Sequence, residues 1–308
     1  MSSYLLVFFS ALSAAVGLFL LRKVLDYKGH PSGYLSIFYF FTFLMALVMN
    51  VRARVPFSET FDLKMGGVGI FAGALAVAMM FSVGRALKLG PSGISFAFQN
   101  SGAVLPPLVM VLLFQAPFGF ALTIGNVLGM GLVVAGLFWA ANSSSEEKGK
   151  NKLSRKWALY AILSFIFQGV LLCLYQWKCF LTCHSVPEHG LIPFKCAESG
   201  ECWFMPAMFI SAWIFQILIF GVTLRRGFHL SELLLGCVGG IGNTFTTIFL
   251  LQATKVAHTP SEKAMIFPLF AGLMILLCSF SGRLFYKERI NWPANLVCVA
   301  GILIGTFI

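Results

Sequence analysis

Ten stretches of mostly apolar residues, separated by links that are mostly short and polar, follow one another along the chain of 308 residues. Each stretch is close to the roughly 20 residues that an α-helix needs to cross the hydrocarbon core of a bilayer. The pattern therefore predicts an all-α integral membrane protein with ten transmembrane helices. The predicted segments are residues 4–21, 33–51, 66–84, 93–114, 121–141, 157–177, 205–224, 232–252, 264–281 and 293–308.

The composition agrees with lipid as the main solvent of this chain. Only 11% of its residues are charged and 58% are hydrophobic, whereas soluble domains carry roughly 25% charged residues. The formal net charge is +11, and the basic residues lie at the ends of apolar segments, as Arg22 and Lys23 do. Such charges suit loops beside anionic lipid headgroups, so membrane lipids are expected partners and nucleic acid is not.

The first apolar run is read as a spanning helix and not as a signal peptide. Its positive charges follow the run, and no small-residue cleavage site comes before the polar sequence.

One linker differs from the others. Residues 142–156 are polar, charged and rich in serine, a composition typical of a flexible and solvated segment. They divide the chain into a first half, residues 1–141, and a second half, residues 157–308.

The two halves align with each other. An offset of 167 residues places Gly69 on Gly236, and an offset of 169 places Asn126 on Asn295. Five segments per half is an odd number, so the second half must cross the membrane in the opposite sense. The sequence therefore predicts two inverted five-helix repeats, a plan that recurs in secondary transporters.

The C-terminal quarter resembles the closing pattern of the drug/metabolite transporter superfamily, in particular its ten-helix EamA-like members. A segment containing Pro268 is followed by a turn with Glu288 and then by the glycine-rich stretch 299–305. The first half echoes this pattern with Pro106 and Pro107, but Gly119 stands where Glu288 is expected. The resemblance implies the ten-helix transporter fold, with a cavity lined by segments one, three, four, six, eight and nine.

Polar residues inside the apolar segments are the candidates for the lining of that cavity, because polar groups in hydrocarbon are costly without a partner or water. The alternative for each of them is an interhelical hydrogen bond that only stabilises packing, and for Lys263 an ammonium that reaches the membrane interface. The substrate-binding candidates are Gln99, Asn100, Ser101, Gln168, Asn243, Thr247 and Lys263.

Two further motifs have structural explanations. The glycine-rich stretches 66–73 and 236–242 lie within or at the start of apolar segments, so we interpret them as close helix contacts and not as dinucleotide loops. Thr259, Pro260 and Glu262 are typical of a helix start.

No acidic residue lies in the middle of an apolar segment. The carboxylate-driven proton antiport of small multidrug resistance relatives therefore has no obvious residue here, which favours neutral, zwitterionic or anionic metabolites carried by facilitation or exchange. The chain also has no G-x-x-x-x-G-K-[ST] loop for ATP and no cluster of acids or histidines for a membrane transferase. We expect no enzyme activity and no cofactor.

Four cysteines fall in the link between the sixth and seventh segments: Cys179, Cys183, Cys196 and Cys202. Their spacings do not match a zinc site, and no metal is expected. Two disulfides are possible if the link faces an oxidising compartment, and free thiols are expected if it faces the cytosol.

Orientation has two alternatives. Links that follow odd-numbered segments hold 15 Lys and Arg, against 7 in the even-numbered links. By the positive-inside rule this places both termini outside, whereas the relatives implied by the resemblance keep both termini in the cytoplasm.

The expected function is that of a secondary carrier of a small-molecule metabolite, such as an amino acid or a nucleotide-like compound, by alternating access around a central cavity. It would act as a monomer or homodimer in the plasma membrane, or in the inner membrane of a bacterium. A multidrug exporter and a non-transporting scaffold or receptor are the alternatives.

Overall fold

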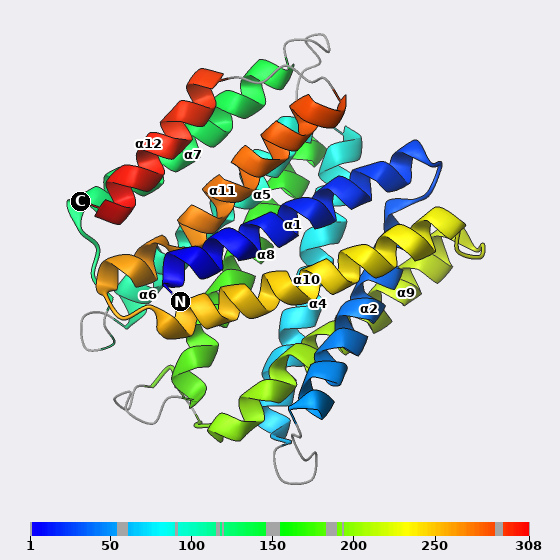
Figure 1. Ribbon diagram of the computed structural model, residues 1–308, viewed down its shortest axis with the longest axis horizontal. Coiled ribbons are helices and arrows are strands. Elements are labelled where there is room, and N and C mark those ends of the chain that lie inside the picture. The colour runs from blue at the N-terminus through cyan, green and yellow to red at the C-terminus, as the bar shows by residue number, and fades with distance from the viewer. Residues whose placement is uncertain are drawn as a thin grey trace. The chain divides into compact units, whose positions relative to one another are not determined.

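The computed structural model is built of helices (Figure 1). It describes residues 2–53, 61–89, 92–114, 118, 120–145, 155–182, 190–192, 194–286 and 292–307. The helices are α1 (Ser3–Asp26), α2 (Pro31–Arg52), α4 (Leu63–Leu89), α5 (Ser92–Ser101), the 3-10 helix η1 (Gly102–Val104), α6 (Leu105–Leu113), α7 (Ile124–Ser145), α8 (Arg155–Thr182), the 3-10 helix η4 (Glu198–Trp203), α9 (Phe204–Leu224), α10 (Leu230–Val256), α11 (Pro260–Tyr286) and α12 (Trp292–Phe307).

The predicted helical character is confirmed, since every predicted segment coincides with a helix. The fourth segment differs, because it is interrupted and forms α5, η1 and α6. In the described part of the chain, seven helices are long and apolar enough to cross a membrane. The chain is therefore a multi-pass helical membrane protein.

The chain divides into two compact units. Unit 1 holds residues 1–11, 78–176 and 250–308, and unit 2 holds residues 12–77 and 177–249. Helices α1, α4, α8 and α10 contribute residues to both units.

In unit 2, α2 and α9 pack along each other in opposite directions (Figure 1). Near the start of α2, Ser32 accepts a hydrogen bond of 2.8 Å from the side-chain amide of Gln216, which lies in the second half of α9. One to two turns further along α2, the ring of Tyr39 stacks on the ring of Phe209, with centroids 6.4 Å apart. The order of these contacts makes the two helices antiparallel.

Glycines let α4 approach α9 within unit 2. A Cβ atom on Gly69 would lie 2.6 Å from the Phe204 carbonyl oxygen, and one on Gly73 would collide with the Met208 carbonyl oxygen. Small residues allow this close backbone approach between helices in lipid, where dispersion contacts take over from the hydrophobic effect.

The same kind of contact joins α10 to α2. A Cβ atom on Gly236 would lie 3.0 Å from the Tyr34 carbonyl oxygen, and one on Gly240 would collide with the Phe38 carbonyl oxygen. The interpretation of both glycine-rich stretches as packing surfaces is therefore confirmed.

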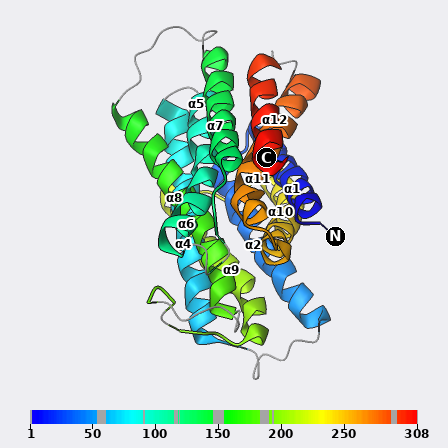
Figure 2. The ribbon, with the colours of Figure 1, turned by 90° about the vertical axis from the view of Figure 1, so that its left-hand side faces the viewer.

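In unit 1, α7 and α12 form the most extensive helix pair (Figure 1; Figure 2). A Cβ atom on Gly129 would lie 2.5 Å from the Gly305 Cα atom and 2.6 Å from the Gly301 carbonyl oxygen. Seven residues along α7, a Cβ atom on Gly136 would lie 2.5 Å from the Cys298 sulfur. Because the partner positions run backwards along α12, these helices are also antiparallel.

A buried asparagine ties the start of α7 to its neighbours. The Asn126 side chain accepts from the Thr123 N–H and the Asn126 N–H donates to the Thr123 hydroxyl, both at 3.0 Å, as in a capping box. Its amide group also donates to the Gly305 carbonyl at 2.8 Å and to the Ser261 hydroxyl at 3.1 Å. The amide is therefore satisfied entirely within unit 1.

Two glycines on α7 give a direct test of the backbone contact. Gly129→Ala places a methyl group against the α12 backbone, and we expect a loss of about 1–3 kcal/mol of stability, the usual range for overpacking. Gly131→Ala is the matched control, because nothing lies within 4 Å of a Cβ atom at that position. Thermal unfolding of the detergent-solubilised variants measures both effects, and equal melting temperatures would contradict the α7–α12 contact.

Candidate functional site

The interruption of the fourth segment is the strongest functional feature of unit 1. Helix α5 ends at Ser101, and the backbone continues through the 3-10 turn before α6 begins at Leu105. Pro106 and Pro107 follow at once, and neither has the N–H that a regular helix needs for its bonds to Gly102 and Ala103. The Gly102 carbonyl accepts instead from the Leu105 N–H. Irregular backbone at membrane depth is tolerated where protein or a water-filled cavity surrounds it.

Helix α8 lies directly against this break. A Cβ atom on Gly102 would lie 2.7 Å from the Phe165 carbonyl oxygen and 3.2 Å from the Gln168 Cβ atom. A hydrogen bond also joins α8 to α5, since the Trp157 indole N–H donates to the Ser95 hydroxyl at 3.0 Å. The predicted candidate Gln168 therefore stands beside the interruption.

Three further candidates occupy the last residues before the break. Asn100 and Ser101 are buried, and Gln99 is half-buried with its amide nitrogen 3.6 Å from the Met79 sulfur. Four of the seven predicted residues, Gln99, Asn100, Ser101 and Gln168, thus belong to one region of unit 1.

Helix α11 packs against η1 and α6 and carries a proline within a continuous helix. Pro268 lies inside this helix, so the Ala264 carbonyl loses its helical donor. Prolines in the fourth and ninth segments, which correspond in the two halves, form the sequence signal that best marks a transporter site. That signal is present in the sequence, at Pro106, Pro107 and Pro268.

The four polar side chains around the break, Gln99, Asn100, Ser101 and Gln168, are three uncharged amides and a hydroxyl. Each of these groups can both donate and accept hydrogen bonds. Such a set suits a polar ligand without a net charge, because these four side chains carry no formal charge to pair with an ion.

One buried group in unit 1 was missed among the candidates. The side-chain oxygen of Gln176, on α8, is buried and has no hydrogen-bond partner in the part of the chain that is described. An unsatisfied buried acceptor costs about 1–3 kcal/mol. Gln176 stands two turns beyond Gln168, about 12 Å along the helix, but the sequence analysis predicts only Gln168 as a cavity residue.

The remaining candidates have structural partners. In unit 2, the Asn243 amide donates to the Thr42 hydroxyl at 3.4 Å, and the Thr247 hydroxyl donates to the Asn243 carbonyl at 3.0 Å. In unit 1, the Lys263 ammonium donates to the Phe118 carbonyl at 3.3 Å and lies 5.4 Å from the centre of the Phe120 ring. Lys263 is thus bound to the link before α7, and its role in a cavity stays a prediction.

The expected start of α11 is confirmed. The Glu262 N–H donates to the Thr259 hydroxyl at 3.2 Å, and the Glu262 carboxylate accepts from the Thr259 and His258 N–H groups at 3.5 and 2.9 Å. These bonds form a capping box and explain Glu262 without a substrate.

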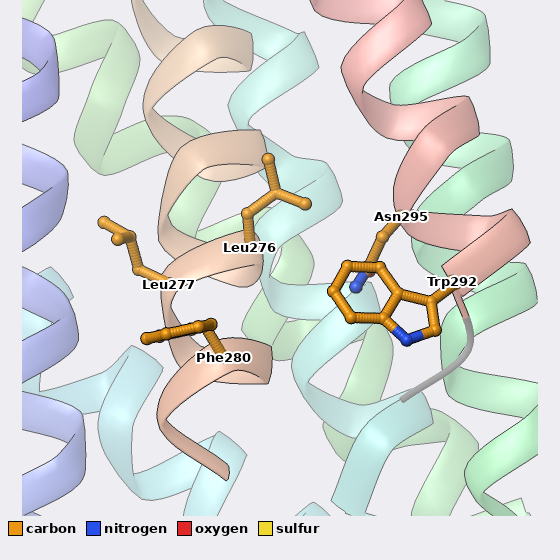
Figure 3. Close-up of a pocket in the computed structure, with 5 residues that line it drawn as sticks. All are labelled: Leu276, Leu277, Phe280, Trp292 and Asn295. Atoms are coloured by element: carbon orange, nitrogen blue, oxygen red, sulfur yellow. The ribbon is translucent and has the colours of Figure 1, made fainter. Parts of the chain in front are cut away.

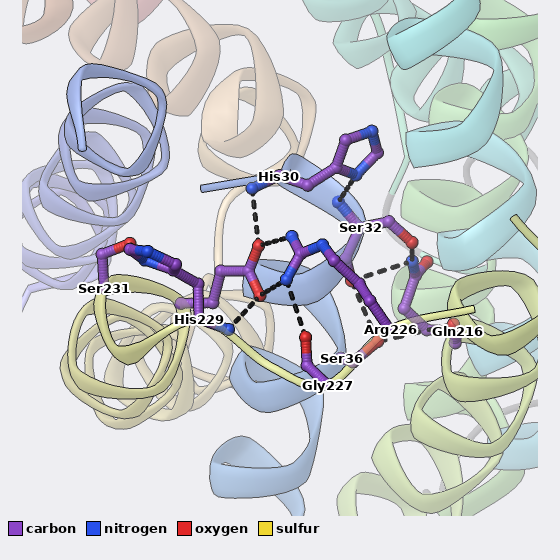
Figure 4. Close-up of polar contacts among 9 residues, drawn as sticks. His30, Ser32, Ser36, Gln216, Arg226, Gly227, His229 and Ser231 are labelled. Carbon is purple, nitrogen blue, oxygen red and sulfur yellow. Dashed lines mark hydrogen bonds and ion pairs between the residues drawn. The ribbon is translucent and has the colours of Figure 1, made fainter. Parts of the chain in front are cut away.

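Figure 4 shows a second polar cluster, in unit 2, which includes His30, Arg226 and His229. The buried carboxylate of Glu232 binds all three. It accepts from the His30 N–H at 2.6 Å and from the His229 N–H at 2.9 Å, and it pairs with the Arg226 guanidinium. The carboxylate thereby caps both α2 and its own helix, where negative charge is stabilised by the helix dipole. A Cβ atom on Gly33 would collide with it. All of its bonds serve the fold, which explains this buried acid.

A third cluster, in unit 2, centres on Asp62 and Cys196, two residues that lie outside the spanning helices. Asp62 caps α4 by accepting from the Lys64 N–H at 2.8 Å, and it also bonds the Cys196 thiol. Burial opposes ionisation of Asp62, but these bonds outweigh it and lower its pKa. Burial and the neighbouring carboxylate raise the pKa of the Cys196 thiol to about 12. Close by, the buried Lys178 pairs with Glu201 and lies 5.0 Å from the Phe204 ring centre.

No disulfide joins Cys179, Cys196 and Cys202 to one another, and Cys183 lies outside the described residues. The disulfide hypothesis therefore stays a prediction. In the described ranges, no group of three His, Cys, Asp or Glu side chains is placed to hold a metal ion.

Comparison with known proteins supports the fold. No family model and no curated protein matches the chain. Solved structures do match, in 28 chains. One of them, described only as "Crystal structure of protein", aligns with 99% of this chain and 94% of its own length, at a TM-score of 0.69 and 16% identity. At this identity the likeness concerns the fold alone, and it extends over nearly the whole chain.

Substitutions at two buried glutamines test whether the Gln176 side-chain oxygen lacks a hydrogen-bond partner in the folded protein. We expect Gln176→Leu to raise the melting temperature by about 2–4 °C, because it removes an unsatisfied acceptor worth about 1 kcal/mol. Gln216→Leu is the matched control and should lower it, since its amide donates to Ser32. Thermal unfolding in detergent measures both, and a similar loss in the two variants would show that Gln176 is satisfied in the folded protein.

The pKa of Cys196 also has a measurable consequence. At pH 8 the thiol should react slowly with maleimide, because almost none of it is thiolate. Asp62→Asn removes the carboxylate charge that raises the pKa and should speed the reaction severalfold. Peptide mass spectrometry after timed labelling gives both rates. An unchanged rate in Asp62→Asn would exclude control by Asp62, and labelling that requires prior reduction would show a disulfide at Cys196.

Proposed function

We propose that this protein is a secondary transporter of a small polar metabolite, with the substrate bound at the break between α5 and α6. The single observation that carries the proposal is this interrupted helix, with Gln99, Asn100, Ser101 and Gln168 around it. Discontinuous helices with uncharged polar groups are how secondary transporters form sites at membrane depth.

Contacts in unit 2 support the inverted repeat that such a mechanism needs. The offset of 167 residues carries Gly69 onto Gly236, and an offset of 170 carries Phe204 back onto Tyr34. The Gly69–Phe204 contact and the Gly236–Tyr34 contact are therefore copies of each other. The second glycine of each helix repeats the relation, one turn along.

Contacts in unit 1 obey the same rule. An offset of 169 exchanges Gly129 with Cys298 and Gly136 with Gly305, so that the Gly129–Gly305 contact becomes the Gly136–Cys298 contact. This is the signature of a two-fold axis through the pair of helices.

Two contacts each join residues that occupy corresponding positions in the two halves, so a two-fold axis would pass through both contacts. They are Tyr39 with Phe209 in unit 2, and Leu132 with Gly301 in unit 1. In both units the corresponding helices are antiparallel, as a two-fold axis in the membrane plane requires. This supports ten spans in two inverted halves, and with it the proposed place among ten-helix drug/metabolite transporters in the plasma membrane.

The chemistry at the break favours an uncharged or zwitterionic substrate that forms hydrogen bonds. Among the described side chains around the break, Gln99, Asn100, Ser101 and Gln168 are polar and none of the four is charged. Transport by facilitation or exchange follows, because the break itself supplies no group to carry a proton.

Flux into proteoliposomes tests the function. Labelled amino acids, nucleosides and nucleotide-like compounds are offered singly and in competition, and the interior is analysed chemically. Uptake of an unaltered compound supports a carrier, while conversion of the compound, or neither flux nor conversion across the panel, would contradict the proposal.

The site itself is tested by Gln99→Ala and Asn100→Ala. Each removes hydrogen bonds worth about 0.5–1.5 kcal/mol and should reduce uptake by about 3- to 10-fold at low substrate concentration. Asn243→Ala tests the other half of the predicted cavity. Thr223→Ala, at an exposed position of α9, is the control for reconstitution. Wild-type uptake in both Gln99→Ala and Asn100→Ala would contradict a substrate site at the end of α5.

A further inference from the structure

A pocket of about 260 Å³ opens between α11 and α12 in unit 1 (Figure 3). Leu276, Leu277 and Phe280 line it from α11, and Trp292 and Asn295 line it from α12. The polar side-chain groups among its lining residues are the amide of Asn295 and the indole N–H of Trp292, and the other three are apolar. None of the residues around the break contributes to it.

The Asn295 amide is a polar group that the fold does not use. The side chain is 5% exposed, and within the described ranges it has no hydrogen-bond partner. Its counterpart in the first half, Asn126, bonds Thr123, Ser261 and Gly305. A buried amide without a partner in a pocket wall indicates a ligand that brings a hydrogen-bond acceptor.

A cation stands at the outer end of the same surface. Arg283 lies one turn beyond Phe280 on α11, is exposed, and has no ion pair within the described residues. Leu276 lies about 10 Å deeper along the helix. The order from the helix end inward is therefore positive charge, then aromatic rings, then aliphatic side chains.

The surface around the pocket is one that lipid, and not water, covers. Phe280 is 61% exposed and Leu296 is 64% exposed. Trp292, which begins α12, has the amphipathic ring typical of the membrane interface. A water-soluble metabolite has no reason to enter a pocket that opens on such a surface.

From these features we infer that the α11–α12 pocket binds one anionic phospholipid. An acyl chain fills the space between Leu276 and Trp292, the Asn295 amide donates to an ester carbonyl, and the phosphate pairs with Arg283. The positive charge of Arg283 and the Asn295 amide, which has no acceptor within the described residues, favour a phospholipid over a plain hydrocarbon chain. This site does not depend on the transport proposal, because it shares no residue with the break.

Native mass spectrometry of the full chain in detergent tests the site, with phosphatidylglycerol and phosphatidylcholine offered at equal concentration. One phosphatidylglycerol should remain bound in preference to phosphatidylcholine. Arg283→Gln should reduce this preference about five-fold, the effect of one basic residue near an anionic lipid surface. Arg155→Gln, at an exposed arginine that begins α8, is the control and should leave the preference unchanged.

Two variants test the contribution of the pocket to lipid binding separately from the charge of Arg283. Leu276→Trp fills the space and should reduce the binding of both lipids, while Asn295→Leu keeps the volume and removes the donor, and should weaken both by about 3- to 10-fold. Monodisperse elution of each variant checks that it is folded. Equal binding of both lipids to wild type, or wild-type binding in Leu276→Trp, would overturn the inference. So would a dimer that Leu276→Trp dissociates, because a second copy would then occupy the pocket.

Discussion

The close approach of helix backbones at glycine is the interaction on which the described structure depends. In lipid the hydrophobic effect gives no reason for apolar helices to meet, so dispersion contacts between closely packed backbones must hold them together. Three helix contacts described above, α4 on α9, α10 on α2 and α7 on α12, place a glycine against a backbone atom of the partner helix. A single side-chain carbon at these positions would push the helices apart and remove the contacts beside them.

Close packing also limits where polar groups can lie. Inside such a bundle every amide and carbonyl needs a partner, and most of those described have one, such as Gln216 with Ser32 or Asn126 with Gly305. The exceptions are therefore informative. Gln176, the carbonyls freed by proline, and Asn295 all belong to unit 1, and each marks a place where the protein alone does not complete its own hydrogen bonds. These are the places where a ligand gains the most by binding.

The sequence predicted helix positions well, because hydropathy alone decides which segments enter lipid. It also predicted that the glycine-rich stretches are packing surfaces and that Thr259 and Glu262 begin a helix, since both patterns consist of residues a few positions apart. It could not predict that Lys263 would bond the Phe118 carbonyl or that Glu232 would cap α2, because both bonds join residues more than 140 positions apart. The break at Gly102 was only partly predictable. Pro106 and Pro107 indicate an irregular backbone, but the segment 93–114 is long enough to be read as one continuous spanning helix.

The two units differ in a way that bears on mechanism. In unit 2 the helix starts are tied by carboxylates, with Asp62 on α4 and Glu232 on both α10 and α2. Bonds to a buried or capping carboxylate are among the strongest that a protein makes. Unit 1 has such a cap as well, Glu262 at the start of α11, but the backbone between α5 and α6 carries none. A change of conformation is therefore easiest at this break, where a backbone already released from regular helix bonds can shift without breaking a carboxylate cap.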